Sequence, residues 1–140
     1  MPDVFTKTKR SEVMSRIRGS RNRDTELRLV SILRKHHITG WRRNSGIFGK
    51  PDFVFPREKL AVFVDGCFWH RHPGCRFAYM PKSRLEFWQR KFDSNVTRDK
   101  IVTRKLRNSG WRTLRVWECQ LHQKHWPKIA RRIVHLLKRG

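Results

Sequence analysis

The amino-acid sequence predicts a single α/β domain in which helices flank a mixed central sheet. Its 140 residues are enough to enclose one hydrophobic core. Some stretches carry apolar residues at helical spacing, and others are short apolar or alternating runs. Along the chain these stretches predict the order helix, hairpin, helix, strand, helix, which favours a layered α/β structure.

The first half of the chain is expected to form a helix and a β-hairpin. A helix over residues 24–35 is indicated by leucine, isoleucine and valine gathered on one face. Glycines and a proline between residues 40 and 51 then predict a loop. The apolar runs DFVF (52–55) and LAVFV (60–64), joined by PREK, are typical of a hairpin whose second strand is buried on both faces.

The second half is expected to contain a long amphipathic helix, a strand and a final helix. The long helix covers residues 83–107, and its apolar stripe is interrupted by the polar pair Asn95 and Asp99. The alternating segment WRTLRVW (111–117) is rich in β-forming residues and predicts a strand. Pro127 favours the start of the last helix, because proline fits the first helical turn.

The long helix connects two predicted strands as a crossover. A strand, a helix and a second strand in this order normally place the two strands parallel and close together. The strand at 60–64 and the strand at 111–117 would then end at the same edge of the sheet. Cys67 follows the first strand and Cys119 follows the second, so we expect these two distant cysteines to meet there.

The charge of the chain indicates a polyanionic partner. Lysine and arginine number 34 against 11 aspartate and glutamate residues, for a formal net charge of +23. Nucleic acid rewards such a surface, because each neutralised phosphate releases counterions. A membrane surface is the alternative, but the sequence contains no run of about 18 apolar residues and no signal-peptide pattern. We therefore expect a protein that binds nucleic acid and no membrane.

The composition also suggests how the chain is organised. Residues 1–22 are basic and lack an apolar pattern, so we expect an arm that becomes ordered on nucleic acid. Residues 23–140 would form the domain. Three cysteines cannot all pair within one chain, and nothing in the sequence suggests secretion. We expect free or metal-bound thiols in a reducing cytoplasm.

Cysteine and histidine are concentrated in the segment GCFWHRHPGC (66–75). Cys67, His72 and Cys75 form a C-x4-H-x2-C pattern, and the predicted crossover adds Cys119. Four nitrogen and sulfur ligands suit a closed tetrahedral Zn²⁺ site. The alternative is that Cys119 is a buried core thiol and the histidines are solvated.

Acidic residues are scarce, so their positions are informative. Asp52 opens the first hairpin strand and Asp65 closes the second, so the hairpin should bring both carboxylates close together. Such a pair suits Mg²⁺ next to a phosphate, although Asp52 can also be a strand start and Asp65 a turn residue.

His70 is not needed by the zinc cluster and is a candidate general base or a surface histidine. Glu26 lies in the first turn of the first helix, where it also favours the helix dipole.

Two aromatic residues in the Cys/His segment have two possible roles. Phe68 and Trp69 lie in a loop among basic residues, where apolar side chains can wedge between base pairs. The other interpretation is that they pack over the metal site. Trp88 lies on the apolar stripe of the long helix, where a core position is the default.

Several segments taken together resemble one known family. These are GKPDFVF with LAVFVDGCFWH, then EFW…K…N…RD, then GW…L…VWEC, and the basic opening KRSEVMSRIRGSRNRDTEL. Over about residues 8–120 the chain resembles the very short patch repair (Vsr) endonucleases. The resemblance implies a restriction-endonuclease-like core, a structural zinc ion and Mg²⁺-dependent nicking of bacterial DNA. It also implies a T:G mismatch, left by deamination of 5-methylcytosine, as the target, with the cut 5′ to the mismatched thymine.

The resemblance further implies roles for individual residues. Asp52 and the Val64 main-chain carbonyl would bind Mg²⁺, His70 would activate water, and Glu26 would be the acidic residue nearby. Asp65 falls at a position where members of the family differ, so its role is either a ligand or a support. The remaining matches are the zinc ligands and the residues that contact DNA, namely Cys67, His72, Cys75 and Cys119 for zinc, and Phe68, Trp69, Trp88 and Asn95 for DNA.

Three functions fit these expectations. The first is a mismatch-directed nickase that acts as a monomer at the bacterial nucleoid in the cytoplasm, alongside mismatch-repair proteins. The second is a zinc-stabilised DNA-binding module without catalysis. The third is a nuclease of the same fold with another DNA target, in phage defence or on a mobile element. No lysine follows Asp65 at the spacing usual in nucleases, so His70 would have to supply the activating group.

Overall fold

The computed structural model describes residues 24–43 and 46–139. The basic arm predicted over residues 1–22 therefore lies outside the described residues. A helix covers residues 24–35. The further elements, in chain order, are β1 (Arg42–Arg43), β2 (Phe53–Phe55), β3 (Leu60–Asp65), α2 (Leu85–Asn108), β4 (Arg112–Trp117), the 3₁₀ turns Glu118–Leu121 and Gln123–His125, and α3 (Trp126–Lys138).

The strands form one mixed sheet in the order β1-β2-β3-β4. β2 and β3 pair antiparallel, with Phe53 opposite Val62. β3 and β4 pair parallel, and their register ends with Asp65 beside Trp117. Both the predicted hairpin and the predicted crossover are therefore present, and the two strands end together at one edge of the sheet.

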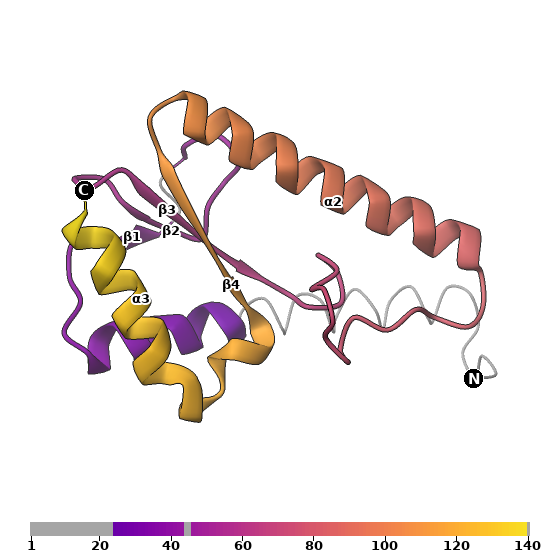
Figure 1. Cartoon of the computed structure of the whole chain (residues 1–140), viewed down its shortest axis with the longest axis horizontal. Helices are drawn as coiled ribbons and strands as arrows, with labels where there is room; N and C mark the ends of the chain where they lie inside the picture. The colour runs from indigo at the N-terminus through magenta and orange to yellow at the C-terminus, as the bar shows by residue number, and fades with distance from the viewer. Residues whose placement is uncertain (1–23, 44–45, 140) are drawn as a thin grey trace.

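Helices cover both faces of this sheet (Figure 1). Alternate residues of β3 point to opposite faces, as the two-residue repeat of a strand requires. Leu60, Val62 and Val64 belong to the larger core, which the helix at 24–35 and α3 complete. Ala61 and Phe63 face the other way and pack against α2. This three-layer arrangement explains why every residue of β3 is apolar up to its last position.

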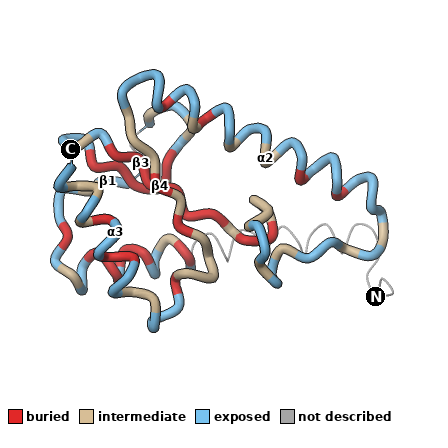
Figure 2. Tube along the Cα trace, in the orientation of Figure 1, coloured by how far each residue is buried: buried red, intermediate tan, exposed pale blue. Residues whose placement is uncertain are grey.

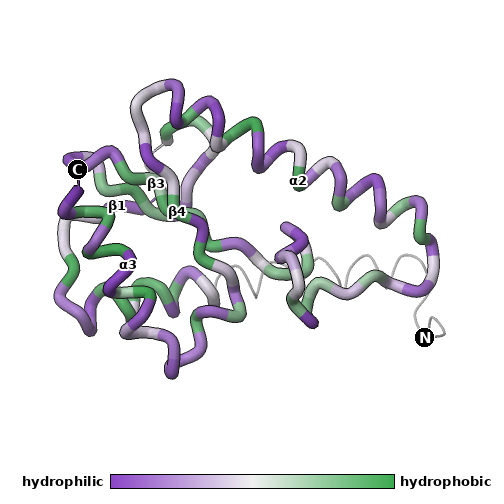
Figure 3. The backbone as a smooth tube through the Cα atoms, in the orientation of Figure 1, coloured by the Kyte–Doolittle hydropathy of each residue, from purple (hydrophilic) through white to green (hydrophobic). Residues whose placement is uncertain are grey.

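Burial is concentrated in the sheet and in the helices on its larger core face. All residues of β2 and β3 are buried, and these two strands form the red centre of Figure 2. The same segments are green in the hydropathy colouring of Figure 3, where α2 alternates between purple and green. The hydrophobic free energy of folding therefore comes mainly from the sheet and its two covering helices.

α2 is anchored at two separate places. Near its C-terminal end, Val102 and Leu106 pack on the sheet. Near its N-terminal end, Trp88 and Phe92 pack on Phe68 instead. The helix leaves the sheet at an angle and runs beyond it, alongside the chain segment that follows β3 (Figure 1). The molecule therefore has a compact part around the sheet and an extension made of α2 and this segment.

One glycine allows a loop to come close to α2. Gly49 has a φ of +82°, and a Cβ atom placed there would overlap a methyl group of Val102. A residue with a side chain would be strained in this backbone conformation and would also displace the helix. Gly49 therefore keeps the loop before β2 in contact with α2, next to Lys50 and Asp52.

The differences from the sequence prediction are small and have local causes. β1 lies inside the segment predicted as a loop, because its two arginines are both exposed and carry no alternation. α2 begins and ends within two residues of the predicted 83–107, and helix ends vary by this amount.

Within residues 24–43 and 46–139, the helices are too short or too polar to cross a bilayer.

Candidate active site

Two polar clusters form where β3 and β4 end. Asp65 and Trp117 close the parallel register, and Cys67 and Cys119 each follow two residues later. One cluster is made of thiols and an imidazole. The other consists of carboxylates and His70, and it lies against α2. The parallel crossover is thus the structural reason that both clusters exist.

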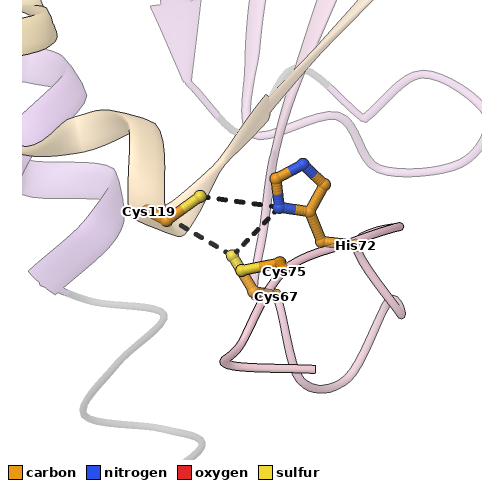
Figure 4. Close-up of side chains that lie close together, drawn as sticks. All are labelled: Cys67, His72, Cys75 and Cys119. Atoms are coloured by element: carbon orange, nitrogen blue, oxygen red, sulfur yellow. Dashed lines mark hydrogen bonds between the residues drawn. The ribbon is translucent and has the colours of Figure 1, made fainter. Parts of the chain in front are cut away.

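The first cluster contains the four predicted metal ligands (Figure 4). His72 Nδ1 lies 3.5 Å from Cys119 Sγ and 3.7 Å from Cys67 Sγ. Together with Cys75, one ligand atom from each residue lies within 4.8 Å of every other. The Cys119 backbone N–H donates to Cys67 Sγ at 3.4 Å. The four residues could therefore hold a metal ion that ties the loop after β3 to the end of β4.

The surroundings of this cluster favour metal binding. Burial raises the pKa of the Cys67 thiol and lowers the pKa of His72. A neutral His72 ring has a free lone pair for a metal, and a cation would replace the proton on Cys67. The His72 ring also stacks on Trp117, with 4.3 Å between ring centroids. This contact fixes the orientation of the imidazole.

Asp52 is the centre of the second cluster. It lies immediately before β2, and its Oδ2 accepts a hydrogen bond of 2.6 Å from the Val64 backbone N–H. Burial raises the pKa of Asp52 to about 7, an effect that the Val64 hydrogen bond opposes and that contact with Glu26 reinforces. A cation bound next to this buried carboxyl would stabilise its ionised form and lower its pKa again.

Glu26 reaches Asp52 from the first described helix. Its Oε2 forms an ion pair of 2.6 Å with Arg43 Nη2, so β1 supplies the cation that holds this side chain. Hydrogen bonding and charge from Glu26 both contribute to the raised pKa of Asp52. Glu26 therefore lies next to Asp52, as the family resemblance implied. Neither its spacing from Asp52 in the sequence nor its place in the helix predicted this.

His70 is paired with a carboxylate from α2. Its Nδ1 lies 2.7 Å from Asp99 Oδ2. An ionised carboxylate only accepts, so the proton lies on Nδ1 and the lone pair of the neutral ring lies on Nε2. Burial lowers the pKa of His70, but the Asp99 hydrogen bond and the charges of Asp65 and Asp99 outweigh it, and the net pKa is raised. This pair has the arrangement of an oriented general base.

Asp65 is buried and neutralised by an arginine. It is 3% exposed, and its Oδ2 accepts a hydrogen bond of 2.8 Å from Arg115 Nη1. Burial raises the pKa of Asp65, while His70 and Arg115 act in the opposite direction. Asp65 therefore supports the neighbourhood of His70, and its carboxylate is already committed to a cation from the protein.

A cavity of about 260 Å³ brings these groups together. Its lining includes Asp52, Asp65 and the His70–Asp99 pair, together with Glu26 and the backbone neighbour Val64. The lining also includes two cationic residues and one amide, namely Lys50, Arg98 and Asn95. The cavity therefore has positive as well as negative charge on its walls. It has the size and the polar lining to admit a phosphate group with a cation.

The predicted DNA-contacting aromatics form a cluster beside this cavity. Phe68 is 5% exposed and Trp88 is 8% exposed, and their ring centroids are 5.6 Å apart. Trp69 is half-buried and packs against both rings. Asn95 Nδ2 donates to the Trp69 carbonyl oxygen at 3.1 Å. The three rings therefore pack on one another, and Trp69 is the most accessible of them.

The sequence interpretation missed two residues of the site. Asp99 appeared only as a polar interruption of the apolar helix stripe, and Arg115 only as a polar position in an alternating strand. The interruption was a usable signal, because a carboxylate on the inner face of a helix requires a partner. Arg115 gave no such signal, since an arginine is common on the outer face of a strand.

This arrangement can support phosphodiester hydrolysis. Asp52 offers a hard oxygen ligand beside the Val64 peptide, which suits Mg²⁺ or a similar divalent ion. The His70–Asp99 pair offers a proton acceptor in the same cavity. Attack on a phosphate needs both a group that neutralises charge and a group that activates water.

Comparison with known proteins identifies the family. Residues 2–76 match the family model described as DNA mismatch endonuclease Vsr. The chain is 39% identical to the DNA mismatch endonuclease Vsr of Escherichia coli, over 86% of this chain and 76% of that protein. It is 40% identical to the type II nicking enzyme V.XorIIP of Xanthomonas oryzae, over 86% of this chain and 88% of that enzyme. Since the family model matches more than half of the chain and both relatives are about 40% identical over most of it, this chain belongs to the Vsr family of DNA mismatch endonucleases.

Proposed function

We propose that this protein is a Mg²⁺-dependent nicking endonuclease that cuts DNA 5′ to the thymine of a T:G mismatch. The observation that carries the proposal is the meeting of Asp52 and the His70–Asp99 pair in one cavity. The family and its nicking relatives support the reaction class. The catalytic residues of the proposal are Asp52 and His70, with Glu26, Asp65 and Asp99 as supporting acids.

The proposed mechanism assigns each group one task. Asp52 and the Val64 main-chain carbonyl would hold Mg²⁺, and the ion would supply polarisation of the scissile phosphate. His70 accepts a proton from the attacking water at Nε2, while Asp99 holds the ring through Nδ1. Glu26 adds negative charge next to Asp52 and so strengthens its attraction for a cation.

We propose Zn²⁺ as the ion of the Cys/His cluster. In a tetrahedron with Zn–S bonds of about 2.3 Å and Zn–N bonds of about 2.0 Å, ligand atoms lie about 3.5–3.8 Å apart. The distances from His72 to Cys67 and Cys119 are 3.7 and 3.5 Å. Four protein ligands leave no position for water, so this ion would be structural.

Mismatch reading is assigned to the aromatic cluster and Asn95. A T:G pair is easier to unstack than a matched pair, so an aromatic ring entering the stack gives preference to the mismatch. Trp69→Ala should therefore reduce the preference for mismatched over matched duplex, while Phe68→Leu serves as a control for packing. Equal losses on both duplexes, with a lowered Tm, would assign Trp69 to packing alone.

The decisive experiment is nicking of duplexes that differ only in one base pair. Each mismatch and the matched control are incubated with and without Mg²⁺ at one salt concentration, because cationic proteins bind DNA in a strongly salt-dependent way. The proposal expects cleavage of the T:G duplex only, on the thymine strand and only with the metal. Equal nicking of matched DNA would assign the protein to another DNA target.

That second candidate, a nuclease of this fold with another target, has a specific observation in its favour. Several relatives are named type II nicking enzymes, including V.NmeAIP of Neisseria meningitidis at 36% identity over 89% of this chain. A DNA-binding module without catalysis is disfavoured by the half-buried His70–Asp99 pair, which such a module would not need. As a mismatch nickase the protein would act as a monomer at the nucleoid in the bacterial cytoplasm, followed by mismatch-repair proteins. The basic residues 1–22 would form a DNA-binding arm of the domain at 23–140.

A further inference from the structure

Arg115 makes more directed contacts to the acidic site than any other cation in residues 24–43 and 46–139. Its Nη1 lies 2.8 Å from Asp65 Oδ2 and 3.8 Å from Asp99 Oδ1. Its Nη2 donates to the Asp99 backbone oxygen at 3.2 Å and to Thr103 Oγ1 at 3.1 Å. The guanidinium also packs over the Phe63 ring at 4.4 Å. It therefore joins β3, β4 and α2 at one point.

The groups around this guanidinium have the chemistry of a divalent cation site. Asp65, His70 and Asp99 each present a ligand atom within 4.8 Å of the others. Asp65 is 3% exposed, so water cannot compensate its charge. Two carboxylates this close together are both ionised only with a cation between them, and Arg115 supplies one from β4.

We propose that Arg115 is a built-in cation that takes the place of a second divalent ion between Asp65 and Asp99. In this position it is a positioning residue for the reaction. It holds the α2 backbone and the Asp99 carboxylate, and Asp99 in turn holds His70. The inference rests on the proposed nicking reaction for its kinetic part only, since metal binding is measured without DNA.

The planar fork of arginine is what the site requires. One terminal nitrogen reaches the two carboxylates and the other reaches the α2 backbone and Thr103. A lysine ammonium is a single point charge and can serve only one of these directions well. Arg115→Lys therefore keeps the positive charge but loses the simultaneous contacts to the carboxylates and to α2. This variant separates the role of Arg115 as a cation from its role in positioning Asp99.

The first test counts bound Mn²⁺ by electron paramagnetic resonance on the full chain with one equivalent of Zn²⁺. Arg115→Met should bind one Mn²⁺ per chain more than the wild type, because it leaves the carboxylates without a cation. Arg115→Lys, and the double variant Arg115→Met with Asp65→Asn, should bind the same number as the wild type. An unchanged count in Arg115→Met would overturn the proposal that Arg115 replaces an ion.

The second test measures kcat and KM for nicking of the mismatched duplex. Arg115→Lys should lower kcat about 10- to 100-fold, the usual effect of removing a group that orients a catalytic residue. KM should stay within about twofold of the wild type, because Arg115 touches carboxylates of the protein. A raised KM with unchanged kcat would overturn the positioning role and make Arg115 a DNA contact.

Arg104→Met is the matched control. Arg104 lines the same cavity of about 520 Å³ as Arg115, and within the described part of the chain it makes no hydrogen bond or ion pair to Asp65 or Asp99. Its loss of charge should leave kcat and the Mn²⁺ count unchanged. If Arg104→Met changed kcat and the Mn²⁺ count as Arg115→Met does, both changes would come from the general loss of positive charge, and the inference would fail.

Absence of nicking by the wild type would refute the proposed function and leave the Mn²⁺ test standing.

Discussion

The Cys/His cluster and the carboxylate cluster lie at the same edge of the sheet but differ in design. The first has four possible ligand atoms within 4.8 Å of one another, from a loop and the end of β4. The second has carboxylates and a histidine around a cavity of about 260 Å³. The first is closed by its own ligands, whereas the second leaves room for another molecule.

This difference shows how one strand pair supports both stability and chemistry. Soft thiol ligands that surround an ion completely give a cross-link. Hard oxygen ligands with raised pKa values and an open side give a reactive site. His70 lies between Cys67 and His72 in one loop, so a metal ion bound by the Cys/His cluster would hold the loop that carries His70. Changes in the first should therefore alter stability, and changes in the second should alter the rate.

The largest effect is expected from Asp52→Asn. Loss of the charged ligand should reduce nicking by about 10³-fold, because neutralisation of the phosphate charge is worth several kcal/mol. Binding to duplex DNA, measured by fluorescence anisotropy, should change by less than about twofold, since many other cations hold the backbone. Undiminished cleavage in Mg²⁺ would remove Asp52 from the site.

Cys119→Ser should have the opposite profile. Removing the ligand that joins β4 to the loop should release the metal and lower Tm by about 10 °C, which corresponds to about 3 kcal/mol for a domain of this size. Metal content by mass spectrometry and Tm by circular dichroism check both parts. A wild-type protein without metal in this cluster would contradict the assignment as a metal cross-link.

Asp99→Asn should change the pH dependence of nicking. In the proposed mechanism His70 acts in its neutral form, and Asp99 raises its pKa, so the wild-type rate should rise with pH through this raised value. In the variant the acid limb should shift to lower pH, and the maximal rate should fall about 10- to 100-fold. A single-turnover pH profile at saturating Mg²⁺ gives both quantities. An acid limb at the same pH in both proteins would show that His70 is not the base.

The smallest effect concerns stability without metal. The pKa of Asp52 is about 7 in the folded protein and lies above its unfolded value of 3.8. The folded state therefore binds more protons between these values, and stability falls as pH rises from about 4 to 7. Asp52→Asn should remove this loss and stabilise the metal-free protein at pH 8 by at least about 1 kcal/mol. Urea unfolding of the metal-free wild type and variant at pH 4 and pH 8 tests the prediction. A variant no more stable than the wild type at pH 8 would contradict it.

The sequence was informative where local pattern and topology decide the structure. The continuous apolar run of β3 and the long helix after it predicted the crossover, and the crossover predicted the meeting of Cys67 with Cys119. The Vsr resemblance assigned Asp52, His70 and the four thiol and imidazole ligands. The Arg115 contacts could not be predicted, because they depend on how α2 lies over β4. The burial of Phe68 was also left open, since a loop position alone does not show what covers it.

The parallel pairing of β3 with β4 has a consequence for how the protein folds. β2 can pair with β3 early through a short turn, but β4 lies 52 positions further along the chain in their register, as Leu60 beside Arg112 shows. Contacts at such separation form slowly, because a long loop must close first. Until then one edge of β3 is unpaired, and an apolar strand with a free edge is a template for aggregation. Conditions that delay docking of β4, such as a shortage of metal for Cys119, should therefore lower the yield of native protein through aggregation of a partly folded state.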